Sequence, residues 1–542
     1  MSFPLLTAAA VLPAAGAIAT AAVPAARRTA AKWTALIASL GTLVLAGVVL
    51  ARFEPGGDRY QLTESHAWIA DFGVRYELGV DGIGAALIGL TALLMPFIIL
   101  AGWRDADPAE EAEGAGGDRP GRRWRPVQGF FALILMVEAM VIISFAATDV
   151  FLFYIFFEAM LIPMYFLIGG FGDRAHAQSD EEAAKQRTYA AVKFLLYNLA
   201  GGLIMLAAVV GLYAVTADQL GEGTFSLQRI VEARAAGELE MAVTTERLLF
   251  LGFFFAFAIK APLWPLHTWL PNAMGESTAP VAVLITAVMD KVGTFAMLRF
   301  CLGLFPGASD WATPVILVLA LISIVYGALL AVGQRDIKRL IAYASVSHFG
   351  FIVLGIFAMT SQGQSGATLY MVNHGISTAV LMLVAGFLIS RRGSRLIADY
   401  GGVQKVAPVL AGTFLIGGLA TLSLPGLAPF VSEFLVLVGT FSRYPVIGII
   451  ATAGIVLAAL YVLVLYQRTM TGPVKESLGR MPDLRPRELA VAAPLIALLI
   501  FLGVFPRPLT EIVNPAVEHT LSDVRKTDPR PDVPAQDLEA AK

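Results

Sequence analysis

The chain has 542 residues, of which 57% are hydrophobic and only 15% are charged. Soluble globular proteins carry about 25% charged residues, so this composition excludes an ordinary soluble enzyme and indicates a polytopic membrane protein. The net charge of −2 excludes the basic field that nucleic acid binding requires. The single cysteine, Cys301, excludes a disulfide framework, an iron–sulfur cluster and a thiolate zinc site.

Apolar runs that could cross a bilayer recur along the whole chain. A bilayer core is about 30 Å thick, and roughly 20 apolar residues of helix are needed to span it. We therefore expect an all-α polytopic membrane protein with about fourteen spans, near 4–24, 33–52, 82–102, 129–147, 150–170, 189–214, 247–270, 279–301, 312–332, 340–359, 366–389, 408–441, 445–466 and 488–505. The first is predicted to be a retained span, because it lacks the basic region that opens a signal peptide.

Three stretches outside these spans are polar. Segments 104–127 and 171–188 are rich in glycine, proline or charge and are predicted to be loops. The tail at 507–542 is polar and rich in proline, so we expect no further span there and disorder in part of it. The sequence contains no glycine-rich phosphate motif, and it therefore offers no evident nucleotide site.

The seventh and twelfth spans share one flaw. The seventh has two prolines just after Lys260, and the twelfth has two prolines shortly before Glu433. Proline removes a backbone donor and clashes with the preceding turn. Broken helices at membrane depth must face protein or water, and such breaks in corresponding halves of a chain are typical of ion sites in transporters.

The distribution of lysine and arginine predicts the orientation of the chain. Loops after odd-numbered spans are rich in these residues, as at 119–125 and 468–487, whereas loops after even-numbered spans are poorer. Because cytoplasmic loops carry the excess of positive charge, both termini are expected outside the cytoplasm.

Charged side chains at membrane depth are the most informative residues. Each costs about 2.5–3.5 kcal/mol on insertion scales. Glu158 lies in the middle of an apolar span, and we interpret it as a proton site; a buried ion pair that only orders the bundle is the alternative. Lys260, at the first break, would donate a proton if a nearby carboxylate moved away; snorkelling to the headgroups is the alternative.

Two further charges lie deep in later spans. Lys291 is near the middle of the eighth span, and we interpret it as a relay residue rather than a purely structural charge. Asp290 precedes it, but adjacent residues on a helix do not face each other, so we expect Asp290 to be interfacial or partnered. Glu433, just after the second break, is a natural proton acceptor that could also cap the following half-helix.

The charged residues Glu158, Lys260, Lys291 and Glu433 are together called the line below. Histidines in two adjacent spans are candidates to extend it. His348 and His374 titrate near physiological pH and have serine and asparagine nearby, which favours a water-linked relay over simple packing. Glu138, Lys193 and His267 are secondary candidates for the same line. The set offers neither metal-ligand spacing nor a nucleophile with its base, so proton transfer is the chemistry that it supports.

Four stretches around these residues resemble the antiporter-like membrane subunits of NADH:quinone oxidoreductase, respiratory complex I. They are FYIFFEAMLIPMY at 153–165, FAIKAPLWPLHTWLP at 257–271, AYASVSH at 342–348 and LPGLAPFVSE at 424–433. The resemblance covers nearly the whole chain. Two features favour one of the three antiporter-like types: Glu433 stands where the sister subunits resemble one another in having lysine, and no long lateral helix is expected at the C-terminus.

The resemblance implies a fold of fourteen helices with two inverted five-helix repeats and broken helices 7 and 12. It divides the chain into an N-terminal three-helix segment at 1–128, repeats at 129–301 and 312–466, a last helix at 467–506 and a polar tail at 507–542.

The resemblance also implies roles for the candidate residues. Glu158 and Lys260 would form the coupling ion pair, and Lys291 would be the central relay. The two histidines would extend the hydrophilic axis, and Glu433 would end it. The chain would pump protons in a bacterial cytoplasmic (inner) membrane, beside the other membrane subunits of the complex and especially its two sister subunits. It would hold no cofactor or metal, because NADH, FMN, the iron–sulfur clusters and the quinone site would belong to partner subunits.

Two other functions remain open. A subunit of a multi-subunit cation/proton antiporter would share these motifs without a redox partner, although Glu433 favours the redox-driven complex. A membrane scaffold would carry the same charges only as structural pairs, and it predicts that neutralising Lys260 lowers assembly but leaves pumping intact.

Overall fold

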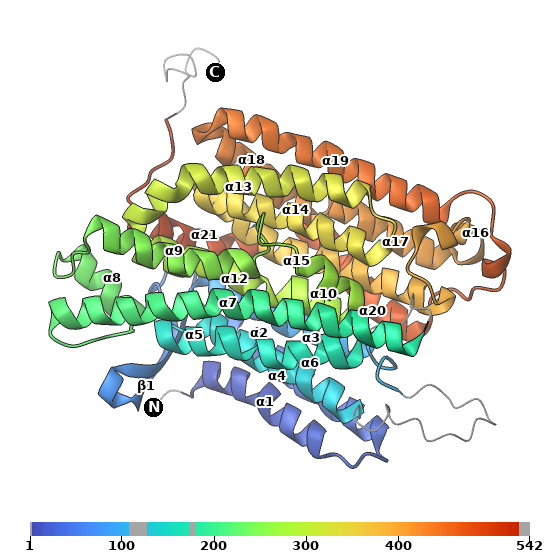
Figure 1. Cartoon of the computed structure of the whole chain (residues 1–542), viewed down its shortest axis with the longest axis horizontal. Helices are drawn as coiled ribbons and strands as arrows, with labels where there is room; N and C mark the ends of the chain where they lie inside the picture. The colour runs from blue at the N-terminus through green and yellow to red at the C-terminus, as the bar shows by residue number, and fades with distance from the viewer. Residues whose placement is uncertain (1–2, 108–126, 173–178, 531–542) are drawn as a thin grey trace.

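The computed structural model describes residues 3–107, 127–172 and 179–530 of the chain. Within these ranges, twelve helices are long and apolar enough to cross a membrane. Figure 1 shows that the long helices run side by side through the molecule as one bundle. The predicted helical, polytopic architecture is therefore confirmed.

The first four long helices form one side of the bundle. They are α1 (Leu5–Ala22), α2 (Arg28–Arg52), α3 (Gly82–Ala101) and α4 (Val127–Ala146). Helix α1 packs against both α4 and α2. The contact is close, because Gly16 of α1 leaves no space for a side chain against Ala38 of α2. The first predicted span is thus an integral part of this packing.

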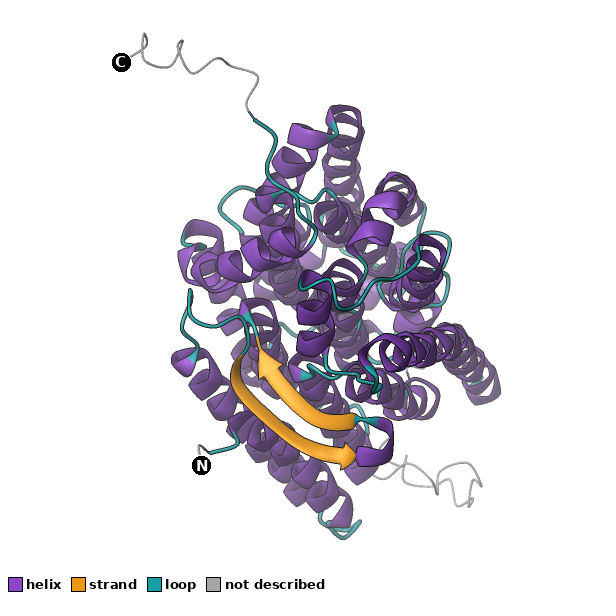
Figure 2. Ribbon diagram, turned by 90° about the vertical axis from the view of Figure 1, so that its left-hand side faces the viewer, coloured by secondary structure: helices purple, strands orange, loops and turns teal. Residues whose placement is uncertain are grey.

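A β-hairpin that the sequence analysis did not predict joins α2 to α3. It consists of β1 (Gln61–Ile69) and β2 (Val74–Val80), paired antiparallel around the short 3₁₀ turn η1 (Ala70–Phe72). Figure 2 shows it lying across the ends of the helices. The Glu64 carboxylate accepts a hydrogen bond of 2.8 Å from the backbone N–H of Leu6, which ties the hairpin to the start of α1.

The next part of the chain contains the longest helix. The elements are α5 (Val150–Ala159), α6 (Leu161–Phe171), α7 (Asp180–Leu220) and the short α8 (Leu227–Ala235). The predicted loop at 171–188 is wrong from residue 180 onward. Ser179 caps α7 by accepting a hydrogen bond from the Glu182 backbone N–H at 3.2 Å, and acidic residues favour a helix start there. Residues 173–178, and 108–126 of the other predicted loop, lie outside the described ranges.

Both predicted helix breaks are present. Helix α9 (Val243–Lys260) ends at its lysine, and the chain resumes as α10 (Leu270–Glu276). In the same way α17 (Pro408–Thr421) stops before α18 (Ala428–Arg443). The prolines in each gap cannot donate a backbone hydrogen bond, so the helix stops where the sequence pattern indicates.

The predicted eighth span is a composite helix. It runs as α11 (Ala279–Val283), the π-helical turn η2 (Leu284–Met289), α12 (Lys291–Ala296) and a second π-helical turn η3 (Met297–Leu302). Every residue from Pro280 through Leu302 is buried. π-Helical turns change the register of side chains along a helix and are frequent at functional sites. The irregularity therefore coincides with the segment that carries Lys291.

The remaining helices complete the bundle. They are α13 (Pro306–Val332), α14 (Ile337–Phe357), α15 (Ser361–Arg392), α16 (Val403–Val406), α19 (Pro445–Met470), α20 (Pro486–Val504) and α21 (Arg507–Asp523), with short 3₁₀ turns η4 (Ile397–Asp399) and η5 (Glu476–Leu478). Helix α15 lies at the centre, in contact with α14, α17, α18, α20 and α21.

The first part of the tail forms a helix that was not predicted. Residues Arg507–Asp523 form α21, which packs against α15 and α3. It buries Val513 and Val517 on one face, because its apolar residues recur at helical spacing. It is not among the helices able to span a membrane. Residues 531–542 of the expected disordered tail lie outside the described ranges.

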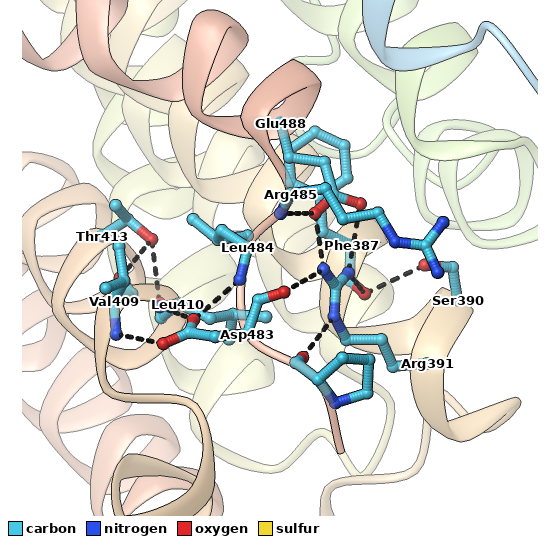
Figure 3. Close-up of polar contacts among 11 residues, drawn as sticks. Phe387, Ser390, Arg391, Val409, Leu410, Thr413, Asp483, Leu484, Arg485 and Glu488 are labelled. Carbon is cyan, nitrogen blue, oxygen red and sulfur yellow. Dashed lines mark hydrogen bonds and ion pairs between the residues drawn. The ribbon is translucent and has the colours of Figure 1, made fainter.

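A buried ionic clasp fixes one end of α15. Arg391 donates to the Glu488 carboxylate at the start of α20 and to the backbone carbonyls of Pro482 and Asp483. The Asp483 carboxylate accepts hydrogen bonds of 2.9 and 2.8 Å from the first backbone N–H groups of α17. Figure 3 shows the contacts of Asp483 with Val409 and Leu410 on one side and those of Arg391 with Glu488 on the other. It holds α15, α17 and α20 together at the end of the second broken span.

Candidate proton-transfer site

The first break exposes Lys260 to the interior of the bundle. Its side chain is fully buried, which contradicts the snorkelling alternative. Its Nζ donates a hydrogen bond of 2.7 Å to the backbone carbonyl of Phe157 on α5 and lies 3.7 Å from the centroid of that residue's ring. A cation over an aromatic face is stabilised electrostatically. Lys260 is therefore held against the turn of α5 that carries Glu158.

Glu158 lies beside Lys260 without touching it. The two side chains interact electrostatically, but the structure places no direct ion pair between them. One carboxylate oxygen of Glu158 is buried and has no hydrogen-bond partner among the described residues. Asp149 caps the N-terminus of helix α5, because its carboxylate accepts a hydrogen bond of 2.8 Å from the Leu152 backbone N–H. Burial raises the pKa of Asp149, at this end of the helix, to about 6.

The position of Glu158 depends on a glycine of α7. A Cβ atom on Gly202 would collide with the Glu158 carboxyl group. We expect Gly202→Ala to displace that carboxyl group and to lower coupled proton transfer several-fold, about 1 kcal/mol in barrier terms, with normal assembly. Gly170→Ala is the matched control, since a Cβ there meets nothing within 4 Å. Equal proton-uptake rates in membrane vesicles from the two variants would contradict the prediction.

Lys291 makes a direct polar contact with one of the two histidines. Its Nζ lies 2.6 Å from Nδ1 of His374 on α15 and 4.1 Å from the ring centroid of Phe349 on α14. Both Lys291 and His374 are fully buried. A charged lysine can donate to Nδ1 only when that nitrogen carries no proton, so the pair is arranged to pass one proton between the two groups.

The two histidines lie together, as the relay interpretation expects. The rings of His348 and His374 are 5.1 Å apart at 79°. Nε2 of His348 lies 3.3 Å from the Tyr461 hydroxyl on α19. In the described chain, Nε2 of His374 has no hydrogen-bond partner, whereas His348 interacts with the backbone of Thr421. Buried polar atoms of this kind are usually satisfied by water, which favours a hydrated line over dry packing.

Glu433 ends the line on α18. It accepts a hydrogen bond of 2.9 Å from the Tyr370 hydroxyl on α15 and another from the Ser423 hydroxyl in the second break. Helix α18 begins five residues earlier and has no side-chain cap, so the capping alternative is not what the structure shows. Tyr370 was missed from the sequence, although its position four residues before His374 places both on one helix face.

The secondary candidates make no hydrogen bond to a group of this line among the described residues. Glu138 on α4 is fully buried, and neither of its carboxylate oxygens has a hydrogen-bond partner within the described ranges. Lys193 is partly exposed on α7 between two tyrosine rings, each 5.9 Å from Nζ. His267 is buried in the first break, where its ring lies 5.5 Å from that of Tyr326.

Of the two positions expected for Asp290, interfacial or partnered, the interfacial one is wrong. Asp290 is fully buried rather than interfacial, and both of its carboxylate oxygens lack a hydrogen-bond partner in the part of the chain that the structure describes. The π-helical turn that ends at Met289 explains the difference, because it alters the helical register just before this residue.

From Glu158 to Glu433, the line passes through neighbouring elements. Lys260 of α9 bonds to α5, α12 packs against both α9 and α15, and α15 packs against α18; these helices are labelled in Figure 1. Each group on the line can hold or release a proton. Within residues 3–107, 127–172 and 179–530, no group of three histidine, cysteine or acidic side chains could hold a metal ion.

Comparison with known proteins places this arrangement in a family. The model of the NADH:quinone oxidoreductase/Mrp antiporter transmembrane family matches residues 147–459. NADH-quinone oxidoreductase subunit M of Mycobacterium tuberculosis is 56% identical over 534 residues, which cover 96% of this chain and 95% of that protein. Subunit M of Rhodobacter capsulatus is 38% identical over 503 residues, which cover 92% of this chain and 92% of that protein.

Solved structures share the fold. A chain of respiratory complex I from Thermus thermophilus with bound NADH matches with a TM-score of 0.82 at 30% identity, over 96% of this chain and 99% of that one. A chain of the Mrp complex from Dietzia matches with a TM-score of 0.78 at 21% identity, over 97% of this chain and 100% of that one. This likeness shows a common fold alone. The fold, its buried ionisable residues and these relatives therefore define an antiporter-like membrane subunit. The chain belongs to the NADH-quinone oxidoreductase subunit M family.

Proposed function

We propose that this chain is the proton-translocating subunit M of a bacterial NADH:quinone oxidoreductase, which couples NADH oxidation and quinone reduction to proton pumping. The observation that carries the proposal is the buried line of proton-carrying groups in a chain so similar to subunit M along its whole length. In this role, the pumped protons would support respiratory electron transport and ATP synthesis.

The contacts support a sequence of proton transfers. Lys260 holds a proton while the Glu158 carboxylate is near, because an opposite charge stabilises the ammonium form. Movement of Glu158 away would make Lys260 a better donor to the centre of the line. Lys291 then exchanges a proton with His374 at their 2.6 Å contact. The proton continues past His348 and its water to Glu433.

The finer organisation is also a proposal. The chain would have fourteen membrane helices, with inverted repeats at 129–301 and 312–466, an N-terminal segment at 1–128, a last helix at 467–506 and a C-terminal segment from 507. The matching breaks after Lys260 and before Glu433 support this division, because paired broken helices mark internal repeats in transporters.

Partners and cofactors follow from the same reasoning. The two sister antiporter-like subunits and the other membrane subunits of the complex would flank this chain in the cytoplasmic (inner) membrane. NADH, FMN, the iron–sulfur clusters and the quinone would bind in partner subunits. Exposed apolar side chains on α13 and α19, such as Val315 and Val456, support contact of those helices with lipid or with a neighbouring subunit.

The orientation has its own test. Cysteine placed at position 3 or at position 530 is expected to react with a membrane-impermeant thiol reagent from outside the cytoplasm, because the predicted cytoplasmic loops carry the excess of lysine and arginine. A cysteine replacing Arg480, in a predicted cytoplasmic loop, is the matched control. Labelling of position 530 only from the cytoplasmic side would reverse the orientation.

Purification tests the function as a whole. An affinity-tagged chain is expected to co-purify with a large assembly that oxidises NADH and reduces quinone. Recovery of the chain with other membrane subunits but without NADH oxidation would instead favour the cation/proton antiporter. The cation/proton antiporter is the second candidate because this chain shares its fold with a chain of the Mrp complex.

A further inference from the structure

Asp290 has no place in the line described so far, although it is buried at its centre. It lies between the π-helical turn η2 and helix α12, and its side chain is fully buried. Neither carboxylate oxygen has a hydrogen-bond partner within the described residues. An unpaired carboxylate in an apolar interior is costly unless a charge, water or function compensates it.

Two lysines supply that compensation. Lys260 and Lys291 both interact electrostatically with Asp290, and Glu158 interacts with Lys260 from the other side. The charges therefore alternate along the line as carboxylate, ammonium, carboxylate and ammonium. Without Asp290, the two lysines would share a single carboxylate, and two like charges in one low-dielectric site destabilise each other.

The packing of the helices explains why Asp290 can serve both lysines. A Cβ atom on Gly293, in the first turn of α12, would lie 2.9 Å from the Ala261 backbone nitrogen and 3.0 Å from the Phe257 carbonyl oxygen. The backbone of α12 thus rests directly on the end of α9, where Lys260 lies. Lys291 meanwhile contacts His374 on α15, so the segment that carries Asp290 and Lys291 packs against both α9 and α15.

Other titratable groups lie on the surrounding elements. The elements that pack against η2 and α12 carry, besides Lys260, the following titratable groups: Tyr370, His374, Arg391 and Arg392 on α15, Glu138 on α4, Arg299 and Cys301 on η3, and Glu246 and Arg247 at the start of α9. His374 is engaged by Lys291, and Arg299 is paired with Asp81 at 2.9 Å. The charges that act on Asp290 are those of Lys260 and Lys291.

We propose that Asp290 carries the proton between Lys260 and Lys291, an inference that rests on the proposed function. In the first step an N–H bond of the Lys260 ammonium breaks and an O–H bond forms on the Asp290 carboxylate, which leaves two neutral groups. In the second step that O–H bond breaks and the proton binds the neutral amine of Lys291, which restores the aspartate anion. Each transfer runs directly or through one bridging water.

The test compares three substitutions in the assembled complex. Asp290→Asn keeps the shape but cannot carry the proton, and the rate of NADH-driven proton uptake per assembled complex should fall about tenfold or more. Asp290→Glu keeps the carboxylate and should retain most of the rate with a shifted pH profile. Asp107→Asn, at a partly exposed ion pair with Lys32, is the control that removes an aspartate elsewhere.

The outcomes separate this inference from the function on which it rests. A normal rate and pH profile in Asp290→Asn, together with a strong loss in Lys260→Ala, overturns only the role of Asp290. A normal rate in Lys260→Ala as well overturns the proposed function. If Asp290→Asn and Asp290→Glu both lower the amount of complex but leave its rate and pH profile unchanged, Asp290 is only a structural counter-ion and the proposal fails.

Discussion

Replacing Lys260 by alanine is expected to remove most NADH-driven proton translocation, by about a hundredfold per assembled complex, while assembly continues. The substitution removes the proposed proton carrier, a fully buried amine that contacts one backbone carbonyl and one aromatic ring. Glu158→Ala should have a similar effect, because it removes the nearby carboxylate that sets the proton affinity of Lys260. The measurement is proton uptake by inverted membrane vesicles supplied with NADH and quinone.

Controls decide whether this loss concerns the relay or the structure. Lys185→Ala removes an exposed lysine of α7 and should leave both rate and assembly unchanged. The amount of complex is read from a native gel in every variant. A scaffold role would show the opposite pattern, with less assembled complex in Lys260→Ala but normal proton uptake by each complex that remains.

Replacing Arg391 by methionine is expected to destabilise the folded chain by about 3–5 kcal/mol. The substitution leaves the Glu488 carboxylate buried without its partner and removes the donor to the carbonyls of Pro482 and Asp483. The loss should appear as a lower temperature of thermal inactivation of the purified complex and as less chain in the membrane. The double variant with Glu488→Met should recover part of the loss, because it no longer buries an isolated charge.

An exposed ion pair provides the comparison for that experiment. Arg507 and Glu511 are 2.7 Å apart on α21, but their side chains are 73% and 54% exposed. Surface pairs contribute about 0–1 kcal/mol, so Arg507→Met should leave thermal inactivation almost unchanged. Equal inactivation temperatures for Arg391→Met and Arg507→Met would show that the clasp does not stabilise the bundle.

The sequence predicted those parts of the molecule that follow from hydropathy and proline. Apolar length located the long helices, and two proline pairs located the breaks beside Lys260 and Glu433, because both signals act through local backbone chemistry. The hairpin escaped prediction, since its strands are short and polar and depend on contacts such as that of Glu64 with the start of α1. Helix α21 escaped because its stability comes from packing against α15 and α3.

The candidate site was predictable residue by residue but not as an arrangement. An ionisable side chain in an apolar run is visible in the sequence, and that alone singled out Lys291 and the histidines. The direct contact of Lys291 with His374 depends on the packing of α12 against α15, which no local pattern encodes. The two π-helical turns around Lys291 were equally hidden, and with them the buried position of Asp290.

The helix-to-helix course of the proposed line has an electrical consequence. Moving one elementary charge across a membrane costs about 2.3 kcal/mol per 100 mV of potential. Lys291 of α12 contacts His374 of α15, and Tyr370 of α15 contacts Glu433 of α18, so a proton on this path moves from helix to helix, parallel to the membrane plane, more than along a helix. That lateral journey does almost no work against the membrane voltage. The electrical work falls on the entry and exit steps, and the speed of lateral transfer should therefore be insensitive to voltage.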